Sequence, residues 1–180
     1  ELDPELYEAH YYFGRHCFAA GDHARAIEEF EAAHRVRPDE FQALALAVNA
    51  ADSLHDSARG DALTQRALPS ALAEIAADPE NGRALYLAAG MQVRLGDVDG
   101  ARSNIEAALR LQPDDFGTLY NAACGYARIG DHERALDLLE RAISAEHGFR
   151  EWIENDSDLD SLRGLPRYRE IMRRLENHGS

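Results

Sequence analysis

The residues best suited to chemistry in this sequence are three alternating aspartates near its carboxyl end, Asp156, Asp158 and Asp160. Their spacing matches the first three ligands of a calcium-binding loop, which also needs a glycine at its sixth position and a glutamate at its twelfth. The sequence has Ser161 and Arg167 at those two places. Calcium binding is therefore not expected, and helix capping together with a solvated loop accounts for the carboxylates.

Other reactive patterns are missing from the sequence. Its eight histidines form no His-x-x-x-His pair beside a glutamate, and there is no Cys-x-x-Cys. A Gly-x-Ser-x-Gly elbow and a phosphate-binding Gly-Lys loop are also absent, and all 19 basic residues are arginine. Cys17 and Cys124 lie in predicted helices, where cysteine is usually a small packing residue. The sequence predicts no catalytic residues, no metal and no cofactor.

Composition and charge narrow the class of protein further. The 180 residues carry a net charge of −14, which would repel nucleic-acid phosphates. No apolar run approaches the roughly 18 to 20 residues of a membrane span. Two cysteines cannot form a disulfide framework, which fits a reducing, cytoplasmic location. We therefore expect neither nucleic acid nor a membrane as partner.

Three sets of residues repeat along the chain at a common spacing. Four of the six prolines are spaced at intervals of 34, 41 and 34 residues, at Pro4, Pro38, Pro79 and Pro113. Four alanines are spaced at intervals of 41, 34 and 34 residues, at Ala26, Ala67, Ala101 and Ala135. Gly-Asp pairs keep the same phase, at Gly21-Asp22, Gly96-Asp97 and Gly130-Asp131. Both series contain one interval of 41 residues instead of 34, which places seven extra residues between Pro38 and Ala67.

Each repeat is predicted to form two antiparallel helices. In the last repeat, Gly130 supplies a left-handed residue that ends the first helix, and Asp131 caps the second. The extra residues of the second repeat are expected in an enlarged loop over 53–60, as a tolerated insertion or a functional bulge. Pro69 is expected to kink the following helix or to mark its start.

This pattern resembles the tetratricopeptide repeat (TPR) family, which combines a 34-residue period with an alanine, a large residue four positions later and a proline. The matching residues are Ala26, Phe30 and Pro38 in one repeat, then Ala101, Ile105 and Pro113 in another, with a glycine of the family pattern at Gly14. The second repeat departs at Ala71 and Glu74, and the fourth has His147 instead of its closing proline. The resemblance implies an all-α solenoid of four helix pairs within residues 1–147, at about 5–40, 41–81, 82–115 and 116–147.

Residues 148–180 break the repeat pattern and are expected to form a capping segment. Pro166 opens a predicted helix whose apolar face could cover the last repeat. The segment resembles the end of TPR modules in larger bacterial proteins. This leaves open a C-terminal regulatory or dimerising domain of a nucleotide cyclase, protein kinase or winged-helix regulator. The first residues, 1–4, look like the end of a preceding repeat, which indicates a fragment.

In TPR arrays the first helices line a concave peptide-binding surface, so the resemblance implies a groove. Counting back 15 residues from the marker alanines selects Tyr11, Tyr86 and Tyr120. The full predicted groove comprises Tyr11, Arg15, Phe18, Asn49, Tyr86, Arg94, Tyr120, Asn121 and Arg128. Other groove walls are expected at Gln42, Ala45, Asp52 and Cys124. A groove requires that Tyr86, Tyr120, Arg94 and Arg128 be substantially exposed; the alternative is that the tyrosines pack between repeats.

The sequence thus predicts a non-catalytic protein–protein interaction module that presents a groove to a peptide or protein. Its arginines would favour a ligand carboxylate. The lysines of the family's carboxylate clamp are missing, so binding of chaperone C-termini is not implied. A homo-oligomer remains open, and an enzyme in its own right is the remaining alternative.

Overall fold

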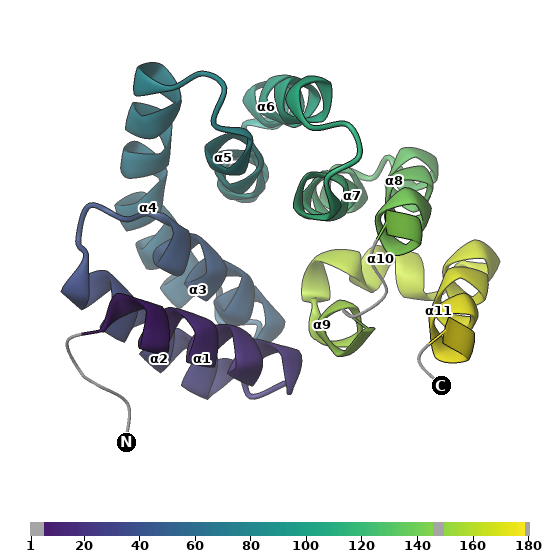
Figure 1. The fold of residues 1–180 in the computed structure, drawn as a ribbon, viewed down its shortest axis with the longest axis horizontal. Coiled ribbons are helices and arrows are strands. Elements are labelled where there is room, and N and C mark those ends of the chain that lie inside the picture. The colour runs from purple at the N-terminus through teal and green to yellow at the C-terminus, as the bar shows by residue number, and fades with distance from the viewer. Residues whose placement is uncertain (1–5, 146–149, 179–180) are drawn as a thin grey trace. The chain divides into compact units, whose positions relative to one another are not determined.

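The computed structural model describes residues 6–145 and 150–178, and over these ranges the chain is all-α with no strand. None of the described helices has the length and apolar character needed to cross a bilayer. The described residues form two compact units (Figure 1). Unit 1 comprises residues 6–73 and 151–157, and unit 2 comprises residues 74–145, 150 and 158–178. Each unit is built from helix pairs, which confirms the predicted fold class.

Unit 1 contains α1 (Tyr7–Ala19) packed against α2 (His23–Val36), and α3 (Gln42–Ser53) also packs against α2. Helix α4 (Ser57–Ala77) begins in unit 1, where Arg59 and Arg66 both pair with Glu31 of α2, at 2.9 and 3.1 Å. The unit also receives most of the short helix α9 (Arg150–Asn155). Its core is apolar, with Phe18 and Phe30 fully buried.

Unit 2 contains two further helix pairs. Helix α5 (Gly82–Arg94) packs on α6 (Val98–Leu111), and α7 (Phe116–Ile129) packs on α8 (His132–Ala145). The first helices of these pairs, α5 and α7, also pack on each other. A 3₁₀ turn (Ser157–Leu159) leads into α10 (Asp160–Arg163), which lies against α7 and α8. The chain then continues into α11 (Pro166–His178).

A residue with left-handed backbone turns the chain between the helices of each pair. Gly130 has φ of 89° and ends α7, as predicted, and the Asp131 carboxylate accepts from the Arg134 N–H at 3.5 Å. In the second pair the corresponding residue is His55, with φ of 56°, and Asp56 caps α4 at the Arg59 N–H, 3.0 Å away. His55 lies 34 residues after Gly21, so the regular period extends further into this repeat than its glycines indicate.

The seven extra residues lengthen a helix, so the expected enlarged loop at 53–60 is wrong. Helix α4 has 21 residues, whereas α2, α6 and α8 have 14 each. Seven residues make about two helical turns, so the insertion returns Leu63, Ala67 and Ala71 to one buried stripe. Pro69 lies inside the helix on its exposed side and does not mark its start.

Helix α11 packs on α8, which confirms the predicted capping helix, and Pro166 is its first residue. Its apolar residues Tyr168, Ile171 and Leu175 are buried, and so is Leu139 on α8. The expected boundary between the last repeat and the cap, at 147/148, lies outside the described residues.

Replacing His55 with glycine should raise the free energy of unfolding by about 0.5–1 kcal/mol. Glycine avoids the roughly 1–2 kcal/mol steric cost of a left-handed L-residue, although it loses more chain entropy on folding. Chemical denaturation of His55→Gly would measure the gain. His55→Ala is the matched control, because alanine keeps the Cβ. If His55→Gly and His55→Ala stabilised the protein equally, the gain could not come from relief of backbone strain at this position.

Shortening Ile171 to alanine should lower the free energy of unfolding by about 2–5 kcal/mol, because the side chain is 2% exposed between α11 and its neighbours. Thermal and urea unfolding would measure the loss. Arg173→Ala, on the exposed side of the same helix, should change it by less than about 0.5 kcal/mol. If Ile171→Ala left the free energy of unfolding unchanged, α11 would not be needed to cover α8.

Candidate functional site

The predicted groove residues divide between the two units. Unit 1 holds Tyr11, Arg15 and Phe18 on α1 and Asn49 on α3. Unit 2 holds the remaining five, at Tyr86, Arg94, Tyr120, Asn121 and Arg128 on α5 and α7. All nine lie on the first helices of their pairs, so each unit offers its own candidate surface.

In unit 1 the predicted residues of α1 form an aromatic surface with a cation beside it. Tyr11 stacks on Tyr7 with ring centroids 5.5 Å apart, and Phe18 lies 4.3 Å from the ring of Trp152. The Arg15 guanidinium lies over two rings, 5.9 Å from the centroid of Tyr11 and 5.5 Å from that of Trp152. Guanidinium groups favour such aromatic faces. The surface is therefore suited to an aromatic side chain.

Residues 151–157 lie on this same surface of unit 1. The Asn155 amide donates to the Ala19 carbonyl at 2.8 Å, at the end of α1. The Ser53 hydroxyl of α3 lies 3.2 Å from the Ser157 hydroxyl and donates to the Asn155 carbonyl at 3.5 Å. Ile153 of the same segment is buried. A short stretch of the chain thus contacts both first helices of unit 1.

In unit 2 the predicted residues of α5 and α7 meet at Gly117. A Cβ atom at Gly117 would lie 3.3 Å from the Tyr86 hydroxyl, so the missing side chain gives this tyrosine room over α7. The Asn121 amide donates to the Gly117 carbonyl at 2.8 Å. Tyr120 stacks on Phe116 with centroids 5.7 Å apart. Tyrosine and asparagine polar groups therefore converge beside an aromatic pair.

The arginines of unit 2 face a carboxylate of the chain itself. Arg128 pairs with Asp158 at 3.1 Å, with side chains 18% and 7% exposed. Burial lowers the pKa of Arg94, and neighbouring Arg128 lowers it further, whereas Asp158 raises it. The Ser161 hydroxyl also donates to the Ala127 carbonyl at 3.2 Å, so the chain after residue 157 is tied to the end of α7.

The structure corrects the expected exposure of the groove residues. Tyr120 is only 4% exposed, so its predicted exposure is wrong, and Tyr11 and Phe18 are also buried. Tyr86, Arg94 and Arg128 are partly buried and fall short of the predicted exposure. The physical reason is local: Tyr11 and Tyr120 stack on aromatic residues one turn away, and Arg128 is paired. The polar edges of α5 and α7 remain accessible, at Tyr86 and Asn121.

Sequence reasoning missed three residues of these surfaces, namely Trp152, Asn155 and Asp158. It assigned the whole segment to covering α8 and its aspartates to helix capping and a solvated loop. The predicted exposure to solvent is wrong for two of the three aspartates, because Asp156 is 1% exposed and Asp158 8%. A signal was present, because Trp152 is the only tryptophan in the sequence and stands in a strongly acidic stretch.

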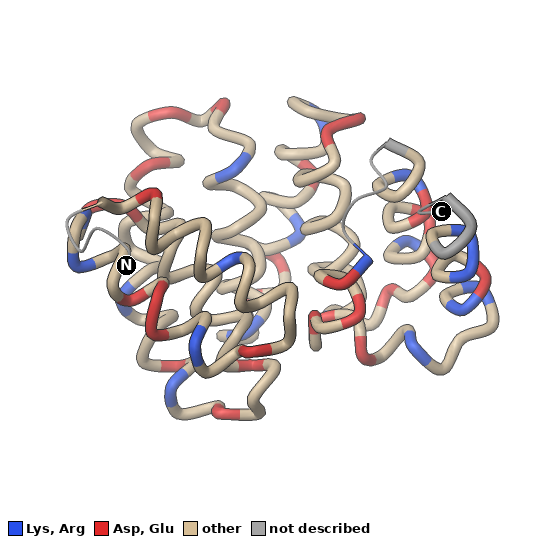
Figure 2. Tube along the Cα trace, turned by 60° about the horizontal axis from the view of Figure 1, so that its bottom comes forward, with Lys and Arg blue, Asp and Glu red and all other residues tan. Residues whose placement is uncertain are grey.

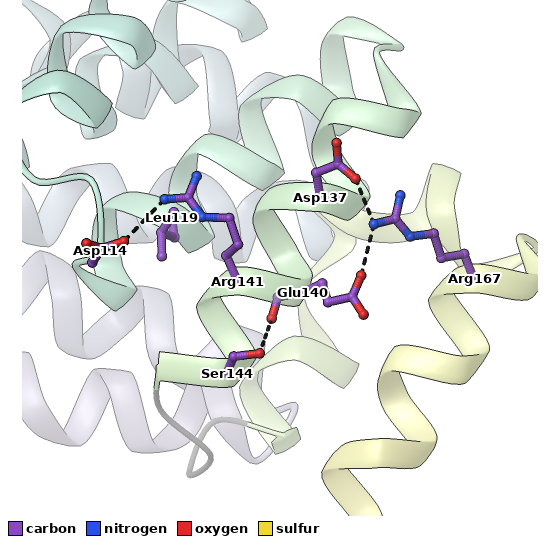
Figure 3. Close-up of a pocket in the computed structure, with 7 residues that line it drawn as sticks. All are labelled: Asp114, Leu119, Asp137, Glu140, Arg141, Ser144 and Arg167. Atoms are coloured by element: carbon purple, nitrogen blue, oxygen red, sulfur yellow. Dashed lines mark hydrogen bonds and ion pairs between the residues drawn. The ribbon is translucent and has the colours of Figure 1, made fainter.

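A separate hollow of about 670 Å³ lies in unit 2 near the cap (Figure 3). Its lining residues are mostly charged: Asp114, Leu119, Asp137, Glu140, Arg141, Ser144 and Arg167. Arg167 pairs with Asp137 at 2.7 Å and Glu140 at 2.9 Å, and Arg141 pairs with Asp114 at 3.3 Å (Figure 3). None of the predicted groove residues lines it. The two Arg167 pairs connect α11 to α8, whereas the Arg141 pair connects α8 to the residues before α7. Because α11 contributes to its wall, we assign the hollow to the cap.

Both cysteines are buried. Burial raises the pKa of the Cys17 thiol, and the Asp22 and Glu29 carboxylates raise it further. A thiol with a raised pKa stays protonated at neutral pH and is a poor nucleophile. Acidic residues are spread over the helices of both units with arginines among them (Figure 2).

Comparison with known proteins identifies the repeat. A family model described as "Tetratricopeptide repeat" matches residues 1–41 and 56–116, more than half of the chain. Interferon-induced protein with tetratricopeptide repeats 3 of Mus musculus is 32% identical over 102 residues, which cover 57% of this chain. The chain spans only 23% of the length of that relative.

Two solved structures are similar over most of the chain. TTC0263, a thermophilic TPR protein of Thermus thermophilus, has a TM-score of 0.56 and 19% identity, covering 96% of this chain and 98% of that one. YrrB, a TPR protein with an unusual peptide-binding site, has a TM-score of 0.43 and 16% identity, covering 83% of this chain and 91% of that one. The likeness to TTC0263 shows a shared fold.

The Arg128 and Asp158 side chains should be strongly coupled to each other, because both are largely shielded from water. A double-mutant cycle with Arg128→Ala and Asp158→Ala should give a coupling energy of at least about 1 kcal/mol in urea unfolding. The exposed pair of Arg163 and Asp160, at 2.7 Å, is the matched control and should give less than about 0.5 kcal/mol. Equal coupling energies in the two cycles would contradict the prediction that shielding from water strengthens the Arg128–Asp158 interaction.

Proposed function

Because the chain belongs to the tetratricopeptide repeat family, we propose that it is a non-catalytic interaction module that binds a peptide or protein segment on the first helices of its repeats. Family membership supports a general protein-binding role, since TPR proteins are generally scaffolds without catalytic activity. The particular surface is our proposal. This surface consists of those predicted groove residues that remain partly exposed, and it leaves out those that are buried.

The observation that carries this proposal is the convergence of Tyr86 and Asn121 at Gly117 in unit 2. The two side chains come from neighbouring first helices, and both are partly exposed. Tyr120 and Phe116 provide a stacked aromatic pair on the same helix as Asn121. A hydroxyl and an amide beside aromatic carbon suit a peptide, which offers both backbone hydrogen bonds and side-chain contact area.

The charge of the same helices supports an acidic ligand. Arg94 and Arg128 lie near the carboxyl ends of α5 and α7, and the surface already holds the carboxylate of Asp158 there. An acidic residue is thus accommodated at this end of the surface, even though the whole chain carries a net charge of −14. We propose that the bound peptide carries at least one carboxylate.

The proposal can be tested with peptides selected from a displayed random library against the full chain. Titration of the selected peptides should show that Tyr86→Ala and Asn121→Ala each weaken binding at least about tenfold, which equals about 1.4 kcal/mol. Circular dichroism should show unchanged helical content. The measurement is the dissociation constant from fluorescence anisotropy of the labelled peptide.

Arg110→Ala is the matched control, because Arg110 is an exposed residue on the second helix α6. It should leave the affinity within about twofold. A library that returns no binder would contradict peptide recognition. Loss of binding in Arg110→Ala, with retention in the other two variants, would assign the ligand to the second helices.

A further inference from the structure

Residues 151–157 are associated with unit 1, although the chain on both sides of them belongs to unit 2. Unit 1 therefore receives seven consecutive residues, Glu-Trp-Ile-Glu-Asn-Asp-Ser, and no other described residue beyond residue 73. A contact made by one short continuous segment has the form of a bound peptide. Recognition of this kind places a short helix against helical side chains.

The contacts of this segment are specific to the types of its side chains. The Trp152 ring packs on Phe18 at a tilt of 34°, with centroids 4.3 Å apart, and lies beneath the Arg15 guanidinium. Three residues later, on the same face of a helix, the Asn155 amide donates to the Ala19 carbonyl at 2.8 Å. Two residues further, the Ser157 hydroxyl meets the Ser53 hydroxyl at 3.2 Å. The surface of unit 1 thus contacts, in sequence order, an aromatic ring, a side-chain amide and a small hydroxyl group.

Two of the four receiving residues, Arg15 and Phe18, were indicated independently by the repeat pattern, whereas Ala19 and Ser53 were not. Arg15 and Phe18 belong to the predicted groove, and α1 and α3 are the first helices of unit 1. An intramolecular ligand on a groove competes with any external one. Since a short tether provides an effective concentration in the millimolar range, an external peptide must bind considerably more tightly than the segment does without its tether.

We propose that unit 1 is a second recognition site, specific for a peptide of the form aromatic-x-x-Asn-x-Ser, and that residues 151–157 occupy it until such a partner displaces them. The inference rests on the proposed function, because it treats first helices as binding surfaces. It names the ligand chemistry for unit 1 and adds an internal competitor. The partner is a different protein that carries this pattern.

The test uses the single tryptophan of the chain as its reporter. In Trp152→Ala/Asn155→Ala the internal ligand loses two of its three side-chain contacts, and the chain has no tryptophan left. A synthetic peptide of residues 150–157 then carries the only tryptophan in the sample. Its emission should shift to the blue on saturable binding to the variant, with an affinity at least about tenfold higher than for the unmodified chain. The same peptide with Trp152→Ala should not compete.

A second measurement covers the case in which the double variant does not fold. The unmodified chain is titrated with the peptide carrying Trp152→Phe, which keeps an aromatic anchor but does not contribute tryptophan emission. Displacement should move the emission of Trp152 to the red. Arg15→Ala should weaken the peptide about two- to fivefold, because one cation–π contact is lost.

Three results would overturn the proposal. A folded double variant that does not bind the peptide would make residues 151–157 a fixed part of unit 1. An unfolded variant together with unchanged emission of the unmodified chain would do the same. Dimerisation that rises with concentration, without peptide binding, would assign the segment to exchange between copies. None of these results affects Tyr86 and Asn121 in unit 2, so the proposed function fails or stands on its own test.

Discussion

A residue with left-handed backbone, followed directly by an aspartate that caps the next helix, reverses the chain within each helix pair. The pattern occurs at Gly96-Asp97 and Gly130-Asp131, and His55-Asp56 adopts it without a glycine. The reversal takes two residues, so the second helix must return along the first. It thereby leaves the first helices of unit 2 free to pack on each other, and the meeting of Tyr86 with α7 depends on it.

The fold was predictable because its determinants are local and repeat. Proline, alanine and glycine recur in phase, and each has a conformational or packing reason for its position. The lengthened helix α4 was not predicted from the sequence, because Gly60 and Pro69 are poor helix formers. Helical periodicity overrode these propensities, since Leu63, Ala67 and Ala71 bury one continuous stripe. The spacing of His55 from Gly21 was the signal for this outcome.

The candidate site was predictable only in part, because a repeat position identifies a helix and a face but not what covers that face. Counting residues placed Tyr120 on α7, whereas its burial depends on stacking with Phe116. The contact between Asn155 and Ala19 joins residues 136 positions apart. The repeat period of the sequence cannot predict a contact between such distant residues. Composition likewise could not indicate that Asp158 finds Arg128, because a carboxylate in an acidic stretch usually remains solvated.

The length of α4 has a consequence for how this architecture can vary. Seven residues rotate a helix by about 700°, only about 20° short of two full turns, so the buried stripe continues almost unchanged. An insertion of five residues would rotate it by about 140° and turn polar positions toward α2. Repeats of this kind therefore tolerate growth in discrete steps of about 10 Å along the helix axis. In unit 1, the added turns carry Arg59 to the same carboxylate that Arg66 reaches, so Glu31 anchors the extension at two successive levels.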